Sequence, residues 1–302
     1  MATAPMYRPD LLQGRHVLVT GGGTGLGRAM AERFLALGAD VSICGRRKSV
    51  CEEAAKALMA AHPAKGTVTA YGVDIRNAQA VDEMIGEVFA KKPLTGLVNN
   101  AAGNFISPTE MLSPRGFDAI ANIVMHGTFY VTQAVGKRWI AAGWKPGDPM
   151  RSVISIITTW VLNGSPFVVP SAMSKSAIHT MTMSLATEWA RHGIRLNCIG
   201  PGEIPTEGMS KRLNPGEDPG TRSKLKNPMA RTGTMDELQN LSTFLMSDGC
   251  DWLTGQSIMM DGGSALATGG NFYELRSWSA EQWQAARDSI EAQNRKDKGE
   301  RG

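Results

Sequence analysis

The sequence lacks the features that mark secreted, metal-binding and membrane-spanning proteins. Its few cysteines form no C-x-x-C pair or other metal-ligand spacing, and they are Cys44, Cys51, Cys198 and Cys250. No apolar run is long enough to cross a bilayer, and residues 1–13 do not have the apolar core of a signal peptide. We therefore expect free thiols, no bound metal, no membrane span and a cytoplasmic protein.

The chain also has little net charge. A formal charge of +4 and a pI near 8.9 are too small a bias to indicate a nucleic-acid-binding protein, although they suit a ligand that carries phosphates. The sequence contains no internal repeat or low-complexity segment. With 302 residues, 42% of them hydrophobic, it is long enough for one large domain with a buried sheet.

What the sequence does contain is a regular alternation of short apolar runs and longer amphipathic segments. We expect the helices to lie between the strands. The expected strands are at 17–20, 41–44, 67–73, 96–99, 152–157, 195–199 and 257–260. This alternation is typical of a parallel sheet with helices on both faces. The expected fold is therefore α/β, a doubly wound parallel sheet of the Rossmann type, in a single domain over residues 1–302.

Two segments depart from the alternation. Residues 201–231 contain five prolines, and a long irregular insertion in a compact domain usually forms a functional lid. Within it we expect one short helix, at 207–213. Residues 265–302 follow the last expected strand and are predicted to form a C-terminal extension, a loop and then a polar helix from Ser279.

A glycine-rich segment, TGGGTGLG at 20–27, directly follows the first expected strand and opens a helix. Its glycines permit a tight turn and close approach of the backbone, and the amides at the helix N-terminus can bind a pyrophosphate. This context predicts a dinucleotide site rather than a structural turn alone. The residues expected to hold the dinucleotide are Gly21, Gly23, Thr24, Gly25, Leu26 and Gly27.

The second and third expected strands end at residues that suit the adenosine half of NADP(H). Arg46 and Arg47 follow the second strand, where an NAD-preferring protein has an acidic residue for the ribose hydroxyls. A guanidinium instead pairs with a 2′-phosphate, so the sequence favours NADP(H) over a solvated basic turn. After the third strand, Asp74 is a candidate acceptor for the adenine amine, with Ile75 beside it, or else a helix cap.

Four features together resemble the short-chain dehydrogenase/reductase family over nearly the whole chain. They are the glycine pattern at 20–27, Asn-Asn-Ala-Ala-Gly at 99–103, Lys175 and Pro-Gly at 201–202. The resemblance implies that the segment at 99–103 supports the central sheet and the adenine side of the cofactor site. It also implies that the Pro-Gly segment lies along the nicotinamide and that Lys175 hydrogen-bonds the nicotinamide ribose. The other cofactor-binding residues it implies are Asn100, Ala101, Ala102, Gly103, Pro201, Gly202 and Ile204.

The catalytic motif departs from the ordinary family pattern. That pattern has a proton-donating tyrosine four residues before the lysine and a carbonyl-polarising serine thirteen residues before the tyrosine. Ser171 and Thr158 hold these positions, and Val124 replaces the usual helix asparagine. Because a serine hydroxyl is a far weaker acid than a phenol, we do not expect ordinary alcohol–ketone chemistry.

One branch of the family, the 2,4-dienoyl-CoA reductases, shares these departures. The chain resembles this branch at 99–110, at 164–175 and in the tail at 270–276. The resemblance implies that NADPH gives hydride to the far end of a conjugated dienoyl thioester, in β-oxidation of unsaturated fatty acids. Negative charge then moves to the thioester oxygen, where hydrogen-bond donors stabilise it, and no strong acid is needed there.

In the mitochondrial-type members of this branch, those donors are a tyrosine eleven residues before the serine and an asparagine just before the glycine of the central helix. Trp160 and His126 hold these positions here. An indole N–H only donates, whereas an imidazole also titrates near neutrality. We hypothesise that both bind the thioester oxygen with help from Ser171, and that water or His126 protonates the carbon. The alternatives are a histidine satisfied elsewhere and a packing tryptophan.

An acyl-CoA substrate carries phosphates, so arginines near the lid are candidates for binding it. Arg76 and Arg212 occupy such positions, the alternative being solvated charges. Apolar loop residues either line the acyl channel or belong to the core. The remaining candidate substrate-binding residues are Asn104, Phe105, Ile106, Ser107, Phe167 and Val168.

Two other functions remain open at this point. One is a reductase of another conjugated acyl-CoA or enone, and the other is a catalytically silent NADP(H)-binding protein, suggested by the loss of both tyrosines. Family members are usually tetramers, so the resemblance also implies a homotetramer. Its subunits would pair through the helices expected at 117–139 and 174–190 and through the last strand.

Overall fold

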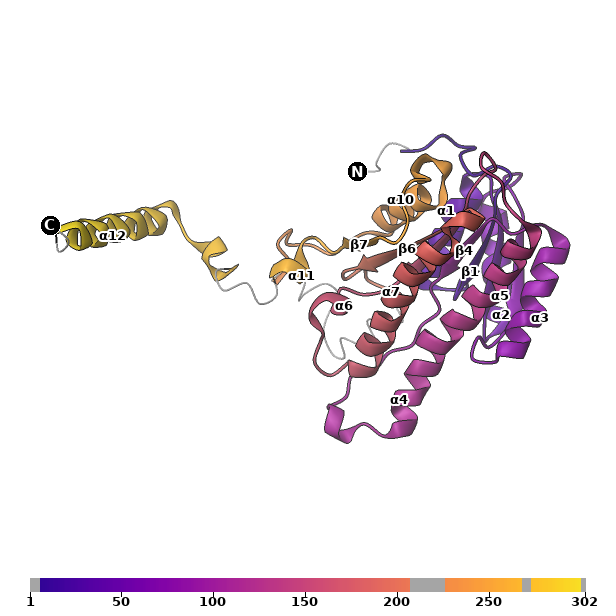
Figure 1. The fold of residues 1–302 in the computed structure, drawn as a ribbon, viewed down its shortest axis with the longest axis horizontal. Coiled ribbons are helices and arrows are strands. Elements are labelled where there is room, and N and C mark those ends of the chain that lie inside the picture. The colour runs from indigo at the N-terminus through magenta and orange to yellow at the C-terminus, as the bar shows by residue number, and fades with distance from the viewer. Residues whose placement is uncertain (1–5, 207–225, 268–272, 300–302) are drawn as a thin grey trace. The chain divides into compact units, whose positions relative to one another are not determined.

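The computed structural model describes residues 6–206, 226–267 and 273–299 (Figure 1). The chain forms two compact units, Met1–Ala265 and Leu266–Gly302. Within the described ranges, no helix has both the length and the apolar character that a membrane crossing requires. The predicted single domain with a lid and an extension stays a prediction.

The larger unit is built on a parallel sheet. Its strands among the described residues are β1 (His16–Thr20), β2 (Asp40–Gly45), β3 (Val68–Gly72), β4 (Gly96–Asn99), β5 (Arg151–Ile156), β6 (Ile194–Pro201) and β7 (Ser257–Met260). They lie in the order β3-β2-β1-β4-β5-β6-β7, and every neighbouring pair is parallel. The order reverses between β1 and β4, which opens a crevice at the carboxyl ends of these strands. The predicted doubly wound sheet is confirmed.

Helices cover both faces of the sheet (Figure 1). Side chains from α1 (Gly25–Ala36), α2 (Lys48–Ala61) and α10 (Met235–Met246) share one hydrophobic core with the sheet. On the other face, a second core includes side chains from α3 (Ala78–Lys91), α5 (Gly127–Ala142) and α7 (Val169–Trp189). The central strands are buried from both sides, which explains why they read as continuous apolar runs.

The central helix differs from the expectation. The helix expected at 117–139 is present, but it contains a π-helical turn, Asn122–His126, between α4 (Pro114–Ala121) and α5. At the start of α5 the backbone lies close to the segment after β3, since a Cβ on Gly127 would be 2.6 Å from Ile75 Cγ1. The helix expected at 174–190 begins earlier, at Val169, with Pro170 in its first turn.

Short elements complete the description. The larger unit also contains η1 (Thr109–Met111), α6 (Trp160–Asn163), η3 (Ala190–His192) and η4 (Asp248–Cys250), and α11 (Ser264–Ala267) spans the boundary between the units. Most of the expected lid, including its helix at 207–213, lies outside the described residues. In the smaller unit, η5 (Tyr273–Ser277) precedes the polar helix expected from Ser279, which is present as α12 (Ala280–Gly299).

Candidate active site and cofactor site

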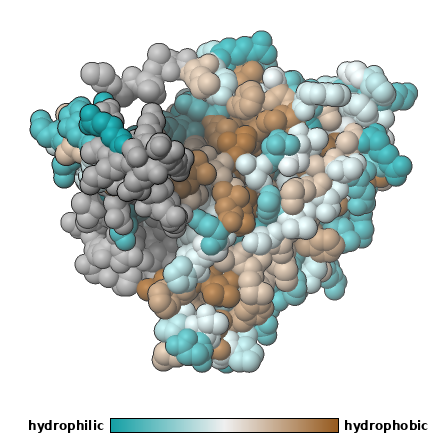
Figure 2. Space-filling view, turned by 60° about the vertical axis from the view of Figure 1, so that its left-hand side comes forward, coloured by the Kyte–Doolittle hydropathy of each residue, from teal (hydrophilic) through white to brown (hydrophobic). Residues whose placement is uncertain are grey.

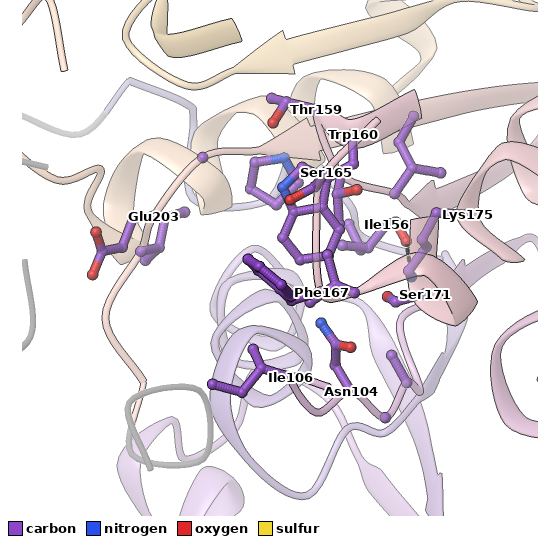
Figure 3. Close-up of a pocket in the computed structure, with 18 of the residues that line it drawn as sticks. Asn104, Ile106, Ile156, Thr159, Trp160, Ser165, Phe167, Ser171, Lys175 and Glu203 are labelled. Carbon is purple, nitrogen blue, oxygen red and sulfur yellow. Dashed lines mark hydrogen bonds between the residues drawn. The ribbon is translucent and has the colours of Figure 1, made fainter. Parts of the chain in front are cut away.

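A cavity of about 1070 Å³ opens at the carboxyl ends of the central strands (Figure 3). Its walls come from the loop after β4, the loop and first turns between β5 and α7, and the segment after β6. Residues from separate parts of the sequence therefore meet in one place. The predicted site residues that line the cavity are Leu26, Asn100, Ala102, Gly103, Asn104, Ser107, Thr158, Trp160, Phe167, Ser171, Lys175, Pro201, Gly202 and Ile204, together with Ile106 and Val168.

The glycine-rich turn between β1 and α1 has the geometry of an anion cradle. Gly21 and Gly25 adopt φ of +65° and +54°, in the left-handed region that favours glycine. A Cβ on Gly27 would lie 2.4 Å from the Gly21 carbonyl oxygen, so only glycine permits this close packing of helix on turn. No described side chain caps the amides at the start of α1. These amides are therefore suited to a pyrophosphate, and the turn fits a dinucleotide.

The loop after β4 is tied to this turn by side-chain hydrogen bonds. Asn100 Nδ2 donates to the carbonyl oxygens of Thr20, at 3.0 Å, and Gly21, at 3.3 Å. The Thr20 hydroxyl in turn accepts from the amides of Asn100 and Ala101, each at 3.0 Å. The supporting role expected for this motif therefore has a structural basis, and the loop passes from the turn into the cavity wall.

The predicted adenine and CoA contacts form an ion pair with each other. Arg76 Nε and Nη2 donate to the two Asp74 carboxylate oxygens at 2.9 Å and 2.5 Å. This guanidinium lowers the pKa of Asp74, with a further contribution from Arg46. Arg46 and Arg47 are exposed just after β2. The two basic side chains and the ion pair belong to the corner of the molecule where the second and third strands end, outside the cavity lining.

Lys175 lies buried on α7 at the floor of the cavity. Its ammonium donates to the Ile156 carbonyl oxygen at the end of β5 (Figure 3). Burial lowers the pKa of the Lys175 ammonium to about 8, and the neighbouring Cys198 acts in the opposite direction. The backbone contact fixes the position of the side chain, so the remaining ammonium hydrogens can serve a ligand in the cavity.

Three potential hydrogen-bond donors line the same cavity as this lysine. Ser171 precedes it by one helical turn on α7 and is only 3% exposed. Thr158 Oγ1 is buried without a hydrogen-bond partner among the described residues. Trp160 is half-buried at the start of α6. All three line the cavity. The structure therefore brings together two hydroxyl donors and one indole donor from the segment after β5, from α6 and from α7.

Among the predicted catalytic and substrate-binding residues, His126 and Phe105 also lie outside the cavity lining. His126 is exposed at the end of the π turn, with its ring 6.2 Å from that of Tyr130, and it is not among the residues that line the cavity. Phe105 is half-buried near Gly116, also away from the lining. Arg212 lies outside the described residues. The structure therefore does not bring His126 together with Trp160.

Sequence reasoning missed polar residues that the cavity contains. Glu203, Thr159 and Ser165 all line it. In Figure 3, Glu203 lies on the opposite side from Lys175, and these are the two ionisable side chains in the described part of the lining. The position of Glu203 in the sequence could have identified it, because it stands between Gly202 and Ile204, two residues that the family pattern predicts to bind the cofactor.

Comparisons with known proteins agree with this geometry. A short chain dehydrogenase from Bacillus anthracis, whose crystal structure is known, is 37% identical to this chain in sequence. The two structures match with a TM-score of 0.73, over 84% of this chain and 97% of that one. A family model described as enoyl-(acyl carrier protein) reductase matches residues 21–265. The chain belongs to the short-chain dehydrogenase/reductase family.

Curated relatives include dienoyl-CoA reductases. A Caenorhabditis elegans protein named "probable 2,4-dienoyl-CoA reductase", (3E)-enoyl-CoA-producing, is 40% identical over 98% of this chain and 95% of its own length. A Bacillus subtilis protein of the same name, (2E)-enoyl-CoA-producing, is 36% identical over 84% of this chain and 98% of its own length. A gluconate 5-dehydrogenase from Burkholderia cenocepacia, solved with NADP and tartrate, is 27% identical with a TM-score of 0.76, covering 85% of this chain and 98% of that one. The family resemblance predicted from the motifs is confirmed.

Proposed function

We propose that this protein is an NADPH-dependent reductase of 2,4-dienoyl-CoA thioesters, which it converts to enoyl-CoA in the β-oxidation of unsaturated fatty acids. One observation carries the proposal. Lys175 is retained in the cavity, but the proton-donor position of the ordinary family reaction holds a buried serine, Ser171. A site of this kind suits reduction of a conjugated thioester, where charge goes to an oxygen, better than reduction of a ketone.

In this proposal, NADPH supplies the hydride. The amides of the turn at 20–27 hold its pyrophosphate, and Arg46 and Arg47 hold its 2′-phosphate. Lys175 holds the nicotinamide ribose, and Pro201 and Gly202 lie along the ring. The related gluconate 5-dehydrogenase with bound NADP supports this choice of cofactor.

Thr158, Ser171 and Trp160 are the proposed donors to the thioester oxygen. Hydride addition at the far end of the diene moves negative charge onto that oxygen, and preorganised donors stabilise it without having to reorient. A proton from water, added to the carbon chain, then completes the reduction to enoyl-CoA. The unpaired, buried hydroxyl of Thr158 is suited to this task. His126 is exposed on the central helix and is not among these proposed donors. Its predicted role stays a prediction.

A panel of thioesters tests the proposed function. We expect NADPH oxidation with 2,4-hexadienoyl-CoA, little with crotonyl-CoA or acetoacetyl-CoA, and slower oxidation of NADH, all followed at 340 nm, because only the diene yields a delocalised dienolate. Turnover of acetoacetyl-CoA alone would make the protein a carbonyl reductase. NADPH binding without turnover of any thioester would make it a silent binding protein. Identifying the position of the product double bond distinguishes between the (3E)- and (2E)-enoyl-CoA products that the names of the relatives give.

The 2′-phosphate contacts give a second prediction. Arg46→Ala and Arg47→Ala should each raise the KM for NADPH by about tenfold, the cost of one lost charge-assisted hydrogen bond, and leave the KM for NADH unchanged. Arg191→Ala is the matched control, because this exposed arginine lies in η3, beyond the C-terminal end of α7. An equal change in both KM values would show that these arginines do not contact the 2′-phosphate.

We also propose a homotetramer. Phe129 on α5 and Met183 on α7 are 43% and 42% exposed, and these are the helices expected to pair. Figure 2 shows hydrophobic side chains exposed on one face of the molecule. Grouped apolar residues of this kind usually mark a contact surface. The cytoplasmic location expected from the sequence stays a prediction.

A further inference from the structure

Phe167 has a backbone conformation that bulky residues avoid. Its φ is +65°, in the left-handed region, where a side chain with a Cβ is strained. The other non-glycine residues with positive φ in the described ranges are alanines, Ala64 and Ala230. Phe167 is therefore the only large side chain that the described structure holds in this way, and such strain in a native protein is usually retained for function.

Neighbouring contacts hold this conformation in place. The Ser107 amide donates to the Phe167 carbonyl oxygen at 2.9 Å, which joins the loop after β4 to the loop after β5. On one side of Phe167 the ring of Pro166 restricts the backbone, and on the other Val168 is 4% exposed and buried. Phe167 is therefore held through its own carbonyl and through both of its neighbours. A change in its backbone conformation would break the hydrogen bond that links the two loops.

The strain turns an apolar ring toward the cavity instead of the core. Phe167 lines the cavity and is 56% exposed, and Ile106, next to Ser107 on the linked loop, is 47% exposed. In Figure 3 the Phe167 ring lies in the cavity, with Asn104 and Ser171 also facing into it. Uncovered apolar surface inside a cavity gains stability only when a ligand covers it, so the ring is placed for a ligand.

We propose that Phe167 is a specificity-determining residue, which selects a flat conjugated acyl chain by stacking on it. This inference rests on the proposed function and names the part of the substrate that the residue recognises. A conjugated diene with its thioester is planar and polarisable, so an aromatic ring can lie offset against it. A saturated chain of the same length offers only ordinary apolar contact. The backbone link through Ser107 sets the position of the ring.

Equilibrium binding tests the proposal without turnover. Dissociation constants are measured calorimetrically for 2,4-hexadienoyl-CoA and for hexanoyl-CoA, with NADP⁺ bound to the full-length protein. We expect Phe167→Leu to lower the preference for the diene by about 3- to 10-fold, the usual size of an aromatic contact, and Phe167→Tyr to retain it. An unchanged preference in Phe167→Leu would overturn the proposal, as would its loss in Phe167→Tyr.

Strain relief is separated from recognition by two glycine variants. Phe167→Gly should keep the melting temperature close to the wild-type value but lose the preference, because glycine adopts positive φ without strain. Ala64→Gly relieves a similar φ of +62° in the exposed connection before β3 and should leave the preference unchanged. A Phe167→Gly variant that retained the preference would show that the ring does not contact the acyl chain.

The outcomes also separate this inference from the proposed function. If the wild-type protein fails to oxidise NADPH with 2,4-hexadienoyl-CoA, the proposed function is wrong, and the ratio of dissociation constants still tests stacking by Phe167. If turnover is present but the ratio does not depend on the residue at 167, the proposed function stands and this inference alone is wrong.

Discussion

Lys175→Met is expected to lower kcat/KM for the NADPH-dependent reduction by about 10³-fold, the order expected when a preorganised charged donor is lost. Lys175 is held in the cavity by the Ile156 carbonyl oxygen, and in the proposed site its other ammonium hydrogens bind the nicotinamide ribose. Without them the hydride donor loses its orientation relative to the substrate. Steady-state kinetics with 2,4-hexadienoyl-CoA and NADPH measures the effect.

The same variant should be no less stable than the wild-type protein. The pKa of Lys175 is about 8 in the folded state, below the ordinary value of 10.5, so the fold disfavours the charged form. That penalty is complete below pH 8 and disappears as the pH rises toward 10.5. Methionine has a similar length and no charge, so at pH 7 the melting temperature should stay equal or rise. A large fall would instead assign Lys175 a structural role.

The lowered pKa also predicts the pH dependence of the reaction. If the ammonium form binds the ribose, kcat/KM should fall as the pH rises through about 8, because this constant reports groups of the free enzyme. Lys56→Met, a change at an exposed lysine on α2, should alter neither the profile nor the rate. A profile that stays flat to pH 9.5 would contradict the assignment.

The sheet and the glycine turn could be predicted because their signals are local. Each strand is a short apolar run between breakers, and all seven expected strands are present in the described part, with ends that match or are shifted by at most two residues. The dinucleotide turn requires glycine at positions such as Gly21 and Gly27, where a left-handed φ or a 2.4 Å approach excludes a side chain. Sequence therefore specifies this half of the site directly.

The substrate end was harder to predict because it depends on how distant segments pack. The π turn at 122–126 adds a residue to the central helix, and one residue corresponds to a rotation of about 100° around a helix axis. Counting residues along an uninterrupted helix therefore does not show which way His126 points, and this side chain is exposed. The pairing of Asp74 with Arg76 is likewise a matter of side-chain conformation at a strand end, which composition and spacing do not encode.

Thr158→Val is expected to lower kcat by about 10²-fold with little change in the KM for NADPH, because it removes one donor to the developing negative charge. The Thr158 hydroxyl is buried, lies on a residue that lines the cavity and has no partner among the described residues. In the proposed site it therefore donates to the thioester oxygen. Valine has nearly the same shape. The folded protein loses no internal hydrogen bond, and its melting temperature should stay equal or rise.

A second threonine, Thr243, provides a matched control for this experiment. Thr243 on α10 is fully buried, and its hydroxyl likewise has no partner in the described structure, but it lies outside the cavity lining. Thr243→Val should therefore match Thr158→Val in thermal stability and differ from it in kcat, which should equal the wild-type value. If the two variants were equally active, the Thr158 hydroxyl would be an unsatisfied structural group like that of Thr243. The charge on the thioester oxygen would then depend on Ser171 and Trp160 alone.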